Sequence, residues 1–199
     1  MEEVILIKLG EIVLKGLNRK VFEQALLNNI RRRISPNGEF DIRSAQSTIY
    51  IRPQSPVADL DVAEEQAGKI FGVIAYSRAC VAKKEMPAIQ AAAAEYLKDE
   101  LQAVSTFKVE GKRSDKKFPL TSMEAAAQVG GYLLARFPHL SVDVHEPELV
   151  VHVEVREDAA YIHGAPRPGA GGLPVGTAGK AAVLISGGID SPVAAWTMA

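Results

Sequence analysis

A strand, a glycine pair and a helix start follow one another near the end of the sequence, and this succession constrains the fold most. Val183 to Ile185 is a short apolar run, typical of a buried parallel strand. The run leads to Gly187-Gly188, where a positive φ costs little and backbone can approach a ligand closely. Asp190 and Ser191 suit a helix N-cap, and Pro192 suits the first turn. Because a helix N-terminus presents N–H groups and a positive dipole end, the pattern predicts a phosphate-binding loop.

Two common phosphate loops do not fit this stretch. Gly179-Lys180 resembles the end of a Walker loop, but no Ser or Thr follows and Pro174 stands where the first glycine belongs. A dinucleotide fingerprint that starts at Gly169 meets Pro174 at its last glycine position. The remaining pattern, Ser-Gly-Gly-x-Asp-Ser, resembles the PP-loop of ATP pyrophosphatases, which grasp the β- and γ-phosphates of ATP. Ser186 and Ser191 add hydroxyl donors, and Asp190 can orient a donor or help to hold Mg²⁺. The alternative interpretation is an ordinary Gly-Gly turn.

The sequence up to Val81 predicts elements in the order strand, helix, strand, strand, helix, strand. Apolar residues recur at helical steps in both helices, and Asn18 can cap the first. The middle strands alternate apolar and polar residues and form a hairpin across residues 44–47. The expected elements are Val4–Leu9, a helix with Phe22, Leu26, Ile30 and Ile34, the hairpin of Phe40 and Ile42 with Ile49 and Ile51, a helix with Leu60, Ala63, Ala67 and Ile70, and Val73–Val81. This order is the split β-α-β unit of ferredoxin-like folds.

A second, alanine-richer α/β unit follows. We expect one helix from Pro87 through Leu101, a strand at Thr106–Lys112, and a helix that the capping box Thr121-x-x-Glu124 opens and that runs to Phe137. Further strands are expected at Val142 and Val144, at Leu149–Val155 and at Ala160–His163. Residues 164–179 are rich in Gly and Pro and read as a linker, although their less monotonous sequence also suits a packed functional loop.

Positive charge is unevenly distributed in a chain whose net charge is only −1. Residues 8–33 and 108–117 carry an excess of Lys and Arg, so a basic face is compatible with the neutral total. The loop after the strand at 106–112 combines flexible cations with an aromatic residue that we expect to be exposed, which suits phosphate contacts and base stacking. The predicted RNA-binding residues are Lys112, Arg113, Lys116 and Phe118. A solvated basic loop without a ligand is the alternative.

The remaining chemistry-bearing residues predict little. Cys80 is the only cysteine, and its apolar surroundings in the sequence favour a buried structural thiol over a sulfur carrier. We find neither a signal peptide nor an apolar stretch of membrane-spanning length, so we expect a cytoplasmic protein without a membrane partner.

Seven motifs, in order along the whole chain, resemble those of the tRNA 4-thiouridine synthetase (tRNA sulfurtransferase) family, which is linked to thiamine biosynthesis. They are Lys8-Leu9-Gly10-Glu11-Ile12, Lys15-Gly16-x-Asn18-Arg19, Phe71-Gly72-Val73, Lys112-Arg113-Ser114-Asp115-Lys116-x-Phe118-Pro119, Asp143-Val144-His145-x-Pro147, Gly171-Gly172-Leu173-Pro174-Val175-Gly176 and Ser186-Gly187-Gly188-Ile189-Asp190-Ser191-Pro192. The resemblance implies an α/β (α+β) chain: a ferredoxin-like domain at 1–75, a THUMP RNA-binding domain at 76–165, a linker at 166–180, and at 181–199 the first strand and helix start of a Rossmann-like PP-loop domain.

The resemblance also implies an activity, which the full-length enzyme performs and this stretch alone does not. ATP adenylates O4 of a uridine in tRNA, and sulfur from a cysteine desulfurase persulfide displaces AMP to give 4-thiouridine; the sulfur also feeds thiazole formation for thiamine. ATP and Mg²⁺ are the implied cofactors, tRNA and the desulfurase are the implied partners, and a homodimer is compatible. Carried over by position, Leu184 and Ile185 line the nucleotide pocket, Ser186, Gly187, Gly188 and Ser191 bind phosphates, and Asp190 is the catalytic residue.

Two functions of other classes stay open. One is a stand-alone RNA-binding module with a vestigial ATP loop, which RNA binding without ATP-dependent AMP or pyrophosphate formation would favour. The other is a PP-loop synthetase that acts on a small molecule, which kinetics unaltered by tRNA would favour.

Overall fold

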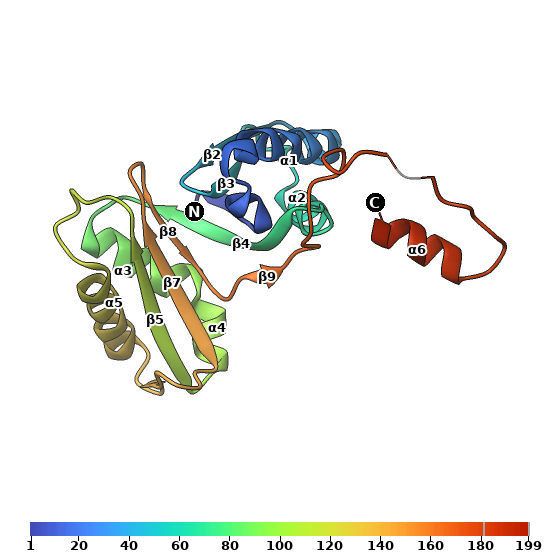
Figure 1. Cartoon of the computed structure of the whole chain (residues 1–199). Helices are drawn as coiled ribbons and strands as arrows, with labels where there is room; N and C mark the ends of the chain where they lie inside the picture. The colour runs from blue at the N-terminus through green and yellow to red at the C-terminus, as the bar shows by residue number, and fades with distance from the viewer. Residues whose placement is uncertain (181, 199) are drawn as a thin grey trace.

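The first part of the chain has the predicted β-α-β-β-α-β order (Figure 1). The computed structural model describes residues 1–180 and 182–198, so the expected domain start at 181 and end at 199 lie outside the described residues. The elements are β1 (Glu3–Leu9), the 3₁₀ turns Glu11–Leu14 and Gly16–Asn18, α1 (Arg19–Ile34), the 3₁₀ turn Ser35–Asn37, β2 (Phe40–Ala45), β3 (Thr48–Pro53), α2 (Leu60–Gly68) and β4 (Val73–Ala82). β1 lies between β3 and β4, antiparallel to both, and β2 pairs with β3. This is the ferredoxin-like arrangement.

The second unit packs two helices and a short third one against four strands. Its elements are α3 (Met86–Tyr96), α4 (Lys98–Ala103), β5 (Thr106–Arg113), α5 (Ser122–Arg136), β6 (Ser141–Val142), β7 (Leu149–Val155) and β8 (Ala160–His163). β5 is parallel to β6 and β7, and β8 returns antiparallel to β7. Both halves of the predicted capping box, Thr121 and Glu124, form at the start of α5. A two-residue strand β9 (Arg167–Pro168) and α6 (Asp190–Met198) complete the described elements.

One long strand joins the two units into a single sheet. β4 pairs with β1 along Val73–Cys80, and its last residues, Cys80–Ala82, pair with β8. Within the residues that the structure describes, the sheet has nine strands in the order β2-β3-β1-β4-β8-β7-β5-β6, with β9 also against β4 (Figure 1). The expected domain boundary between residues 75 and 76 therefore falls inside β4, and backbone hydrogen bonds hold the two units together.

All the core helices pack on one face of this sheet. Tyr76 packs against the first core, with α1 and α2, and Cys80 lies in the second core, with α3 and α5. These two residues are an even number of positions apart on β4 and thus share a face. The opposite face is free of helices, and at its centre lies a small cluster that includes Leu6, Tyr50 and Tyr161. Each fully buried Leu or Ile contributes about 1.5–3 kcal/mol, so the one-sided cores dominate stability.

Several local predictions were wrong. The expected helix 87–101 is interrupted at Leu97 (φ −100°, ψ 22°), which is buried in the second core, so tertiary packing overrides helix propensity. Asn18 precedes α1, but its side chain makes no capping hydrogen bond because a 3₁₀ turn already gives it a near-helical backbone. The hairpin turn is shorter than predicted, with Gln46 and Ser47 at positive φ. Val144 lies outside β6.

The stretch at Val183–Ile185 is not a strand in this structure, contrary to the prediction. Leu184 is 96% exposed and Ile185 72% exposed. A strand needs a neighbour for its backbone groups, and the described sheet does not extend to these residues. None of the helices in residues 1–180 and 182–198 is long and apolar enough to span a membrane.

A buried charge network on the helix-free face connects the two units. Glu154 of β7 accepts a 2.7 Å hydrogen bond from Nζ of Lys8 on β1 and bonds of 2.5 and 3.1 Å from Nη2 and Nε of Arg156. Glu154 is 6% exposed and Arg156 3% exposed. Burial alone would raise the pKa of Glu154, but the imidazole of His163, 3.8 Å away, the charge of Lys8 and these hydrogen bonds outweigh burial and hold that pKa far below its usual range. Burial lowers the pKa of Lys8, and Glu154 opposes that effect.

Arg156 extends the network to the hairpin of the first unit. Its Nη1 donates to Oε1 of Gln46 at 3.2 Å and to Oγ of Ser114 at 3.0 Å, and its Nη2 donates to Oγ1 of Thr48 at 3.4 Å. One buried guanidinium therefore contacts the β2–β3 turn, β7 and the loop after β5.

We expect Glu154→Gln to lower the free energy of unfolding by about 3–5 kcal/mol near neutral pH, because it leaves the guanidinium of Arg156 buried without its countercharge. The folded-state pKa of Glu154 is depressed, so this stabilisation is fully present above the unfolded-state pKa of about 4.3 and is lost as pH falls below it. The difference between variant and wild type should be constant at neutral pH and shrink below about pH 4.5. Denaturant titrations at several pH values measure it.

The matched control is Glu110→Gln, which removes a 49% exposed carboxylate of the same sheet face that pairs with Lys108. Such an exposed pair contributes about 0.5 kcal/mol to the free energy of unfolding. Equal losses for the two variants would contradict the structural role of the buried network.

Candidate nucleic-acid interface and phosphate loop

The basic loop that follows β5 is held in place by the charge network. Ser114 accepts from Arg156, and its own N–H donates to the carbonyl of Val155 at 2.9 Å. Asp115 is 8% exposed, accepts from Nζ of Lys84 at 2.7 Å, and accepts from the N–H of Lys117 at 2.9 Å. The charge of Lys84 and these hydrogen bonds lower the pKa of Asp115. The loop is thus ordered before any ligand arrives.

The four predicted RNA-binding residues divide into two pairs. Lys112 and Lys116 are exposed, as phosphate contacts require. Arg113 instead turns inward, where Nη1 donates to the carbonyls of Phe118 and Leu120, each at 3.2 Å. Phe118 is 6% exposed and belongs to the second core, so the expectation of an exposed stacking ring was wrong. The physical reason is that the Phe118 ring lies close to the start of α5, where burial of a large apolar ring in the core lowers the free energy more than exposure to water.

Two further lysines belong with this surface. Lys117 is exposed beside Lys116, and Lys8 lies near enough to Lys112 for the charge of Lys112 to contribute to the lowered pKa of Lys8. Lys117 directly follows Lys116 in the sequence. Lys8, by contrast, comes near Lys112 only because their strands belong to the same sheet. The sequence signals for Lys8 are its place in the motif Lys8-Leu9-Gly10-Glu11 and at the start of the basic segment 8–33.

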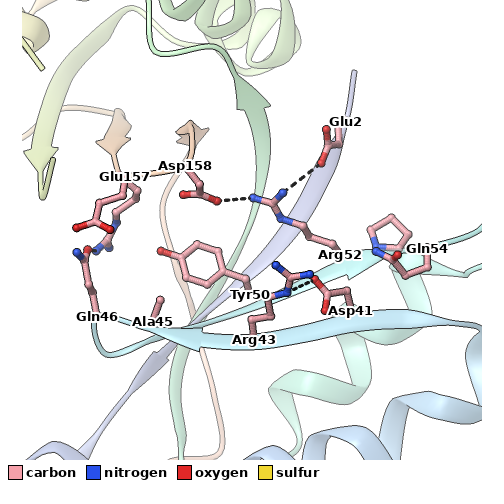
Figure 2. Close-up of a pocket in the computed structure, with 12 residues that line it drawn as sticks. Glu2, Asp41, Arg43, Ala45, Gln46, Tyr50, Arg52, Gln54, Glu157 and Asp158 are labelled. Carbon is pink, nitrogen blue, oxygen red and sulfur yellow. Dashed lines mark hydrogen bonds and ion pairs between the residues drawn. The ribbon is translucent and has the colours of Figure 1, made fainter. Parts of the chain in front are cut away.

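A cavity of about 420 Å³ opens on the helix-free face, where the β2–β3 hairpin meets the β7–β8 turn (Figure 2). Its arginines are already neutralised, because Arg43 pairs with Asp41 at 2.7 Å and Arg52 pairs with Asp158 at 2.8 Å. Tyr50 forms part of the wall (Figure 2). The cavity is electrically balanced and lies at the domain seam, so it is a weaker phosphate site than the exposed lysines.

Hydrogen bonds that involve its two serines, Ser186 and Ser191, hold the predicted phosphate loop together. The N–H of Ser186 donates to Oγ of Ser191 at 3.0 Å, the Ser191 hydroxyl donates to the Ser186 carbonyl at 3.2 Å, and the N–H of Gly188 donates to Oγ of Ser186 at 3.3 Å. Asp190 is the first residue of α6. A Cβ added at Gly187 would meet nothing within 4 Å, so a phosphate group has room to approach the backbone. The loop therefore leaves room for an anion beside the backbone of Gly187, and Leu184 and Ile185 are exposed.

The structure supports the interpretation of Cys80 as a structural thiol. It is fully buried in the second core, and burial raises its pKa to about 12. Among residues 1–180 and 182–198, no group of three or more His, Cys, Asp or Glu side chains is placed to hold a metal ion.

Three family models match the chain in succession. The ThiI ferredoxin-like domain matches residues 4–77, the THUMP domain matches residues 83–163, and the family described as "Thiamine biosynthesis protein (ThiI)" matches residues 176–199. The residues between the first two matches, 78–82, lie in β4, the strand that the two units share.

Curated relatives carry one description. A "Probable tRNA sulfurtransferase" of Acetivibrio thermocellus is 43% identical over 100% of this chain and 51% of its own length. Another, of Alkaliphilus metalliredigens, is 44% identical over 100% of this chain and 50% of its own length. The chain thus spans about half the length of the curated relatives it matches.

Solved structures agree with these relatives. A 4-thiouridine synthetase in complex with RNA and bound ATP has a TM-score of 0.84 and 35% identity, over 99% of this chain and 50% of that one. A protein from Pyrococcus horikoshii has a TM-score of 0.77 and 28% identity, over 87% of this chain and 57% of that one. The chain therefore carries, in order, three domains of the ThiI family: its ferredoxin-like domain, a THUMP domain and the beginning of the ThiI domain.

Proposed function

We propose that this chain is the RNA-binding and nucleotide-loop part of an ATP-dependent tRNA uridine 4-sulfurtransferase. The main support is the likeness, over 99% of the chain, to a 4-thiouridine synthetase crystallised with RNA and ATP. Relatives named tRNA sulfurtransferase, 41–44% identical for the first seven, point the same way. The domain divisions 1–75, 76–165, 166–180 and 181–199 remain part of the proposal, with the first boundary inside β4, and the proposed location is the cytoplasm.

The proposed reaction uses the two parts in sequence. Uridine O4 attacks the α-phosphorus of ATP, pyrophosphate leaves, and the adenylated oxygen becomes a good leaving group. The terminal sulfur of a persulfide, supplied by a cysteine desulfurase, then attacks C4, and AMP departs with the oxygen. A second thiol cleaves the sulfur–sulfur bond of this adduct, which releases 4-thiouridine and leaves a disulfide between the two thiols. Ser186, Gly187, Gly188 and Ser191 hold the phosphates, Leu184 and Ile185 line the nucleotide pocket, and Asp190 acts on the transferring group and its Mg²⁺. The buried thiol of Cys80 takes no part. Thiazole synthesis for thiamine uses the same sulfur, and a homodimer is the proposed assembly.

The proposed RNA contacts are the exposed Lys112 near the end of β5 and the exposed Lys116 and Lys117 of the ordered loop, next to Lys8; together they form the lysine surface. Cations presented on a loop that is already ordered bind phosphates with little loss of conformational entropy. Arg113 positions this loop instead of contacting RNA, because its donors serve loop carbonyls.

We expect the triple variant Lys112→Ala/Lys116→Ala/Lys117→Ala to weaken tRNA binding across tRNA sequences. The slope of the logarithm of the binding constant against the logarithm of the salt concentration should shrink by about two to three, because each lost phosphate contact removes about 0.7–0.9 from it. Filter retention or fluorescence titration over a range of salt concentrations measures both. The control is Lys98→Ala/Arg136→Ala, which removes two cations near the far end of α5 and should leave the slope unchanged. A triple variant that binds like the control would refute the RNA surface.

We expect Asp190→Ala to reduce uridine adenylation at least 100-fold in a protein that joins this chain to the C-terminal half found in its relatives, since charge on the transferring group acts in the transition state. tRNA affinity should stay nearly intact because Asp190 lies outside the lysine surface. Thr197→Ala is the control on the same helix, where the hydroxyl only bonds the carbonyls of Val193 and Ala194. A fall in tRNA affinity parallel to the fall in rate would contradict this division of labour.

A further inference from the structure

The segment Arg167–Val175, which we name the strap, lies in the predicted linker but is hydrogen-bonded to the ferredoxin-like domain. Its strand β9 pairs Arg167 with Tyr76 and Pro168 with Ala75 of β4. Three backbone bonds continue the contact: Gly169 N–H to Ile74 carbonyl at 2.9 Å, Gly171 N–H to Val73 carbonyl at 2.8 Å, and Gly72 N–H to Gly171 carbonyl at 2.6 Å. These bonds favour the packed loop over the plain linker, the two interpretations that the sequence left open.

Side chains of both helices of the first domain also hold the strap. From α1, Nδ2 of Asn29 donates to the carbonyl of Val175 at 3.0 Å. From α2, the carboxylate of Glu64, which is 6% exposed, pairs with Arg167 at 3.2 Å. The strap is thus anchored at its first and last residues.

Glycines make this close contact sterically possible. A Cβ on Gly169 would lie 2.3 Å from the carbonyl oxygen of Val73, and one on Gly72 would lie 2.9 Å from Pro174. Gly72 also has φ +98°, which side-chain-bearing residues rarely adopt. By contrast, a Cβ on Gly164, before the strap, would meet nothing within 4 Å.

The far end of the strap lies beside α6, the helix that follows the phosphate loop. The rings of Phe71 and Trp196 are 5.3 Å apart between centroids. A cavity of about 480 Å³ is lined by Asn29, Phe71, Val175 and Trp196, among others. The contact between α6 and the first domain therefore uses the same corner to which the strap is fixed.

We propose that the strap fixes the phosphate-loop segment to the ferredoxin-like domain, with Asn29, Gly72 and Gly169 as positioning residues. If residues 164–182 were a free tether, their root-mean-square reach would be about 24 Å, whereas residues 176–182 alone reach about 15 Å. The strap thereby confines the phosphate loop near the body that presents the lysine surface. This inference rests on the proposed function, because that function assigns the loop to ATP.

A single fluorophore tests the proposal on this chain. Trp196 is its one tryptophan, so fluorescence anisotropy and acrylamide quenching report on α6 alone. Asn29→Ala should lower the anisotropy of Trp196 and increase its quenching, and amide exchange at Gly169 and Gly171 should accelerate about 2- to 10-fold, as expected for the loss of one supporting hydrogen bond. Gly169→Ala should have the same effect through its clash with Val73.

Two neighbours serve as matched controls. Asn28→Ala removes the adjacent asparagine, which bonds Gln24 on its own helix, and Gly164→Ala adds a methyl group in open space. Both should leave the Trp196 signal and the strap amides unchanged.

A measurement of tRNA binding distinguishes failure of this proposal from failure of the proposed function. The strap variants should bind tRNA with affinity and salt slope within about twofold of wild type, while the triple lysine variant loses both. If the Trp196 fluorescence of Asn29→Ala and Gly169→Ala equals that of the controls, the strap does not position the phosphate loop. This conclusion holds even if the triple lysine variant shows that the lysines bind tRNA. If the strap variants lose tRNA affinity along with the Trp196 contact, the strap stabilises the RNA-binding body instead, and the proposal is likewise overturned.

Discussion

The ion pairs of Glu154 with Lys8 and Arg156 are the interaction on which the arrangement of this chain depends. They lie on the face of the sheet that has no helices, beside the small apolar cluster in which Tyr50 of the first unit packs against Tyr161 of the second. Buried ion pairs contribute little net stability compared with apolar replacements of the whole pair. Removal of one partner is strongly destabilising, however, because it leaves a buried charge without its countercharge. Through Lys8, Gln46 and Thr48 the network adds side-chain contacts between the two units to the backbone pairing of β4, and its contact with Ser114 holds the basic loop.

The shared strand β4 and the strap explain how separate sequence modules become one body. β4 carries the first core at one end and the second core at the other. The strap then returns along the same strand, at Ala75 and Tyr76, before the chain reaches the phosphate loop. The two domains and the segment that leads to the phosphate loop are thus joined to the same strand by backbone hydrogen bonds.

Local patterns in the sequence predicted local structure well. Alternation and helical periodicity identified the elements of both units, and the capping box of Thr121 and Glu124 forms as expected. Features that depend on distant residues escaped prediction: the burial of Phe118, the inward turn of Arg113, and the pairing of the strap with β4. Lys112 and Lys116 could be selected from the sequence because exposure of a loop lysine needs no partner, whereas the approach of Lys8 requires the complete sheet.

The proposed function requires that the two joined domains bind tRNA through the lysine surface beside the helix-free face. Backbone NMR spectra of the chain titrated with tRNA test this most directly. The account predicts that the amide signals of Lys8, Lys112, Lys116 and Lys117 shift together at one binding constant, while those of Lys98 and Arg136 stay in place. Shifts confined to α4 and the end of α5, with the lysine loop unaffected, would contradict it.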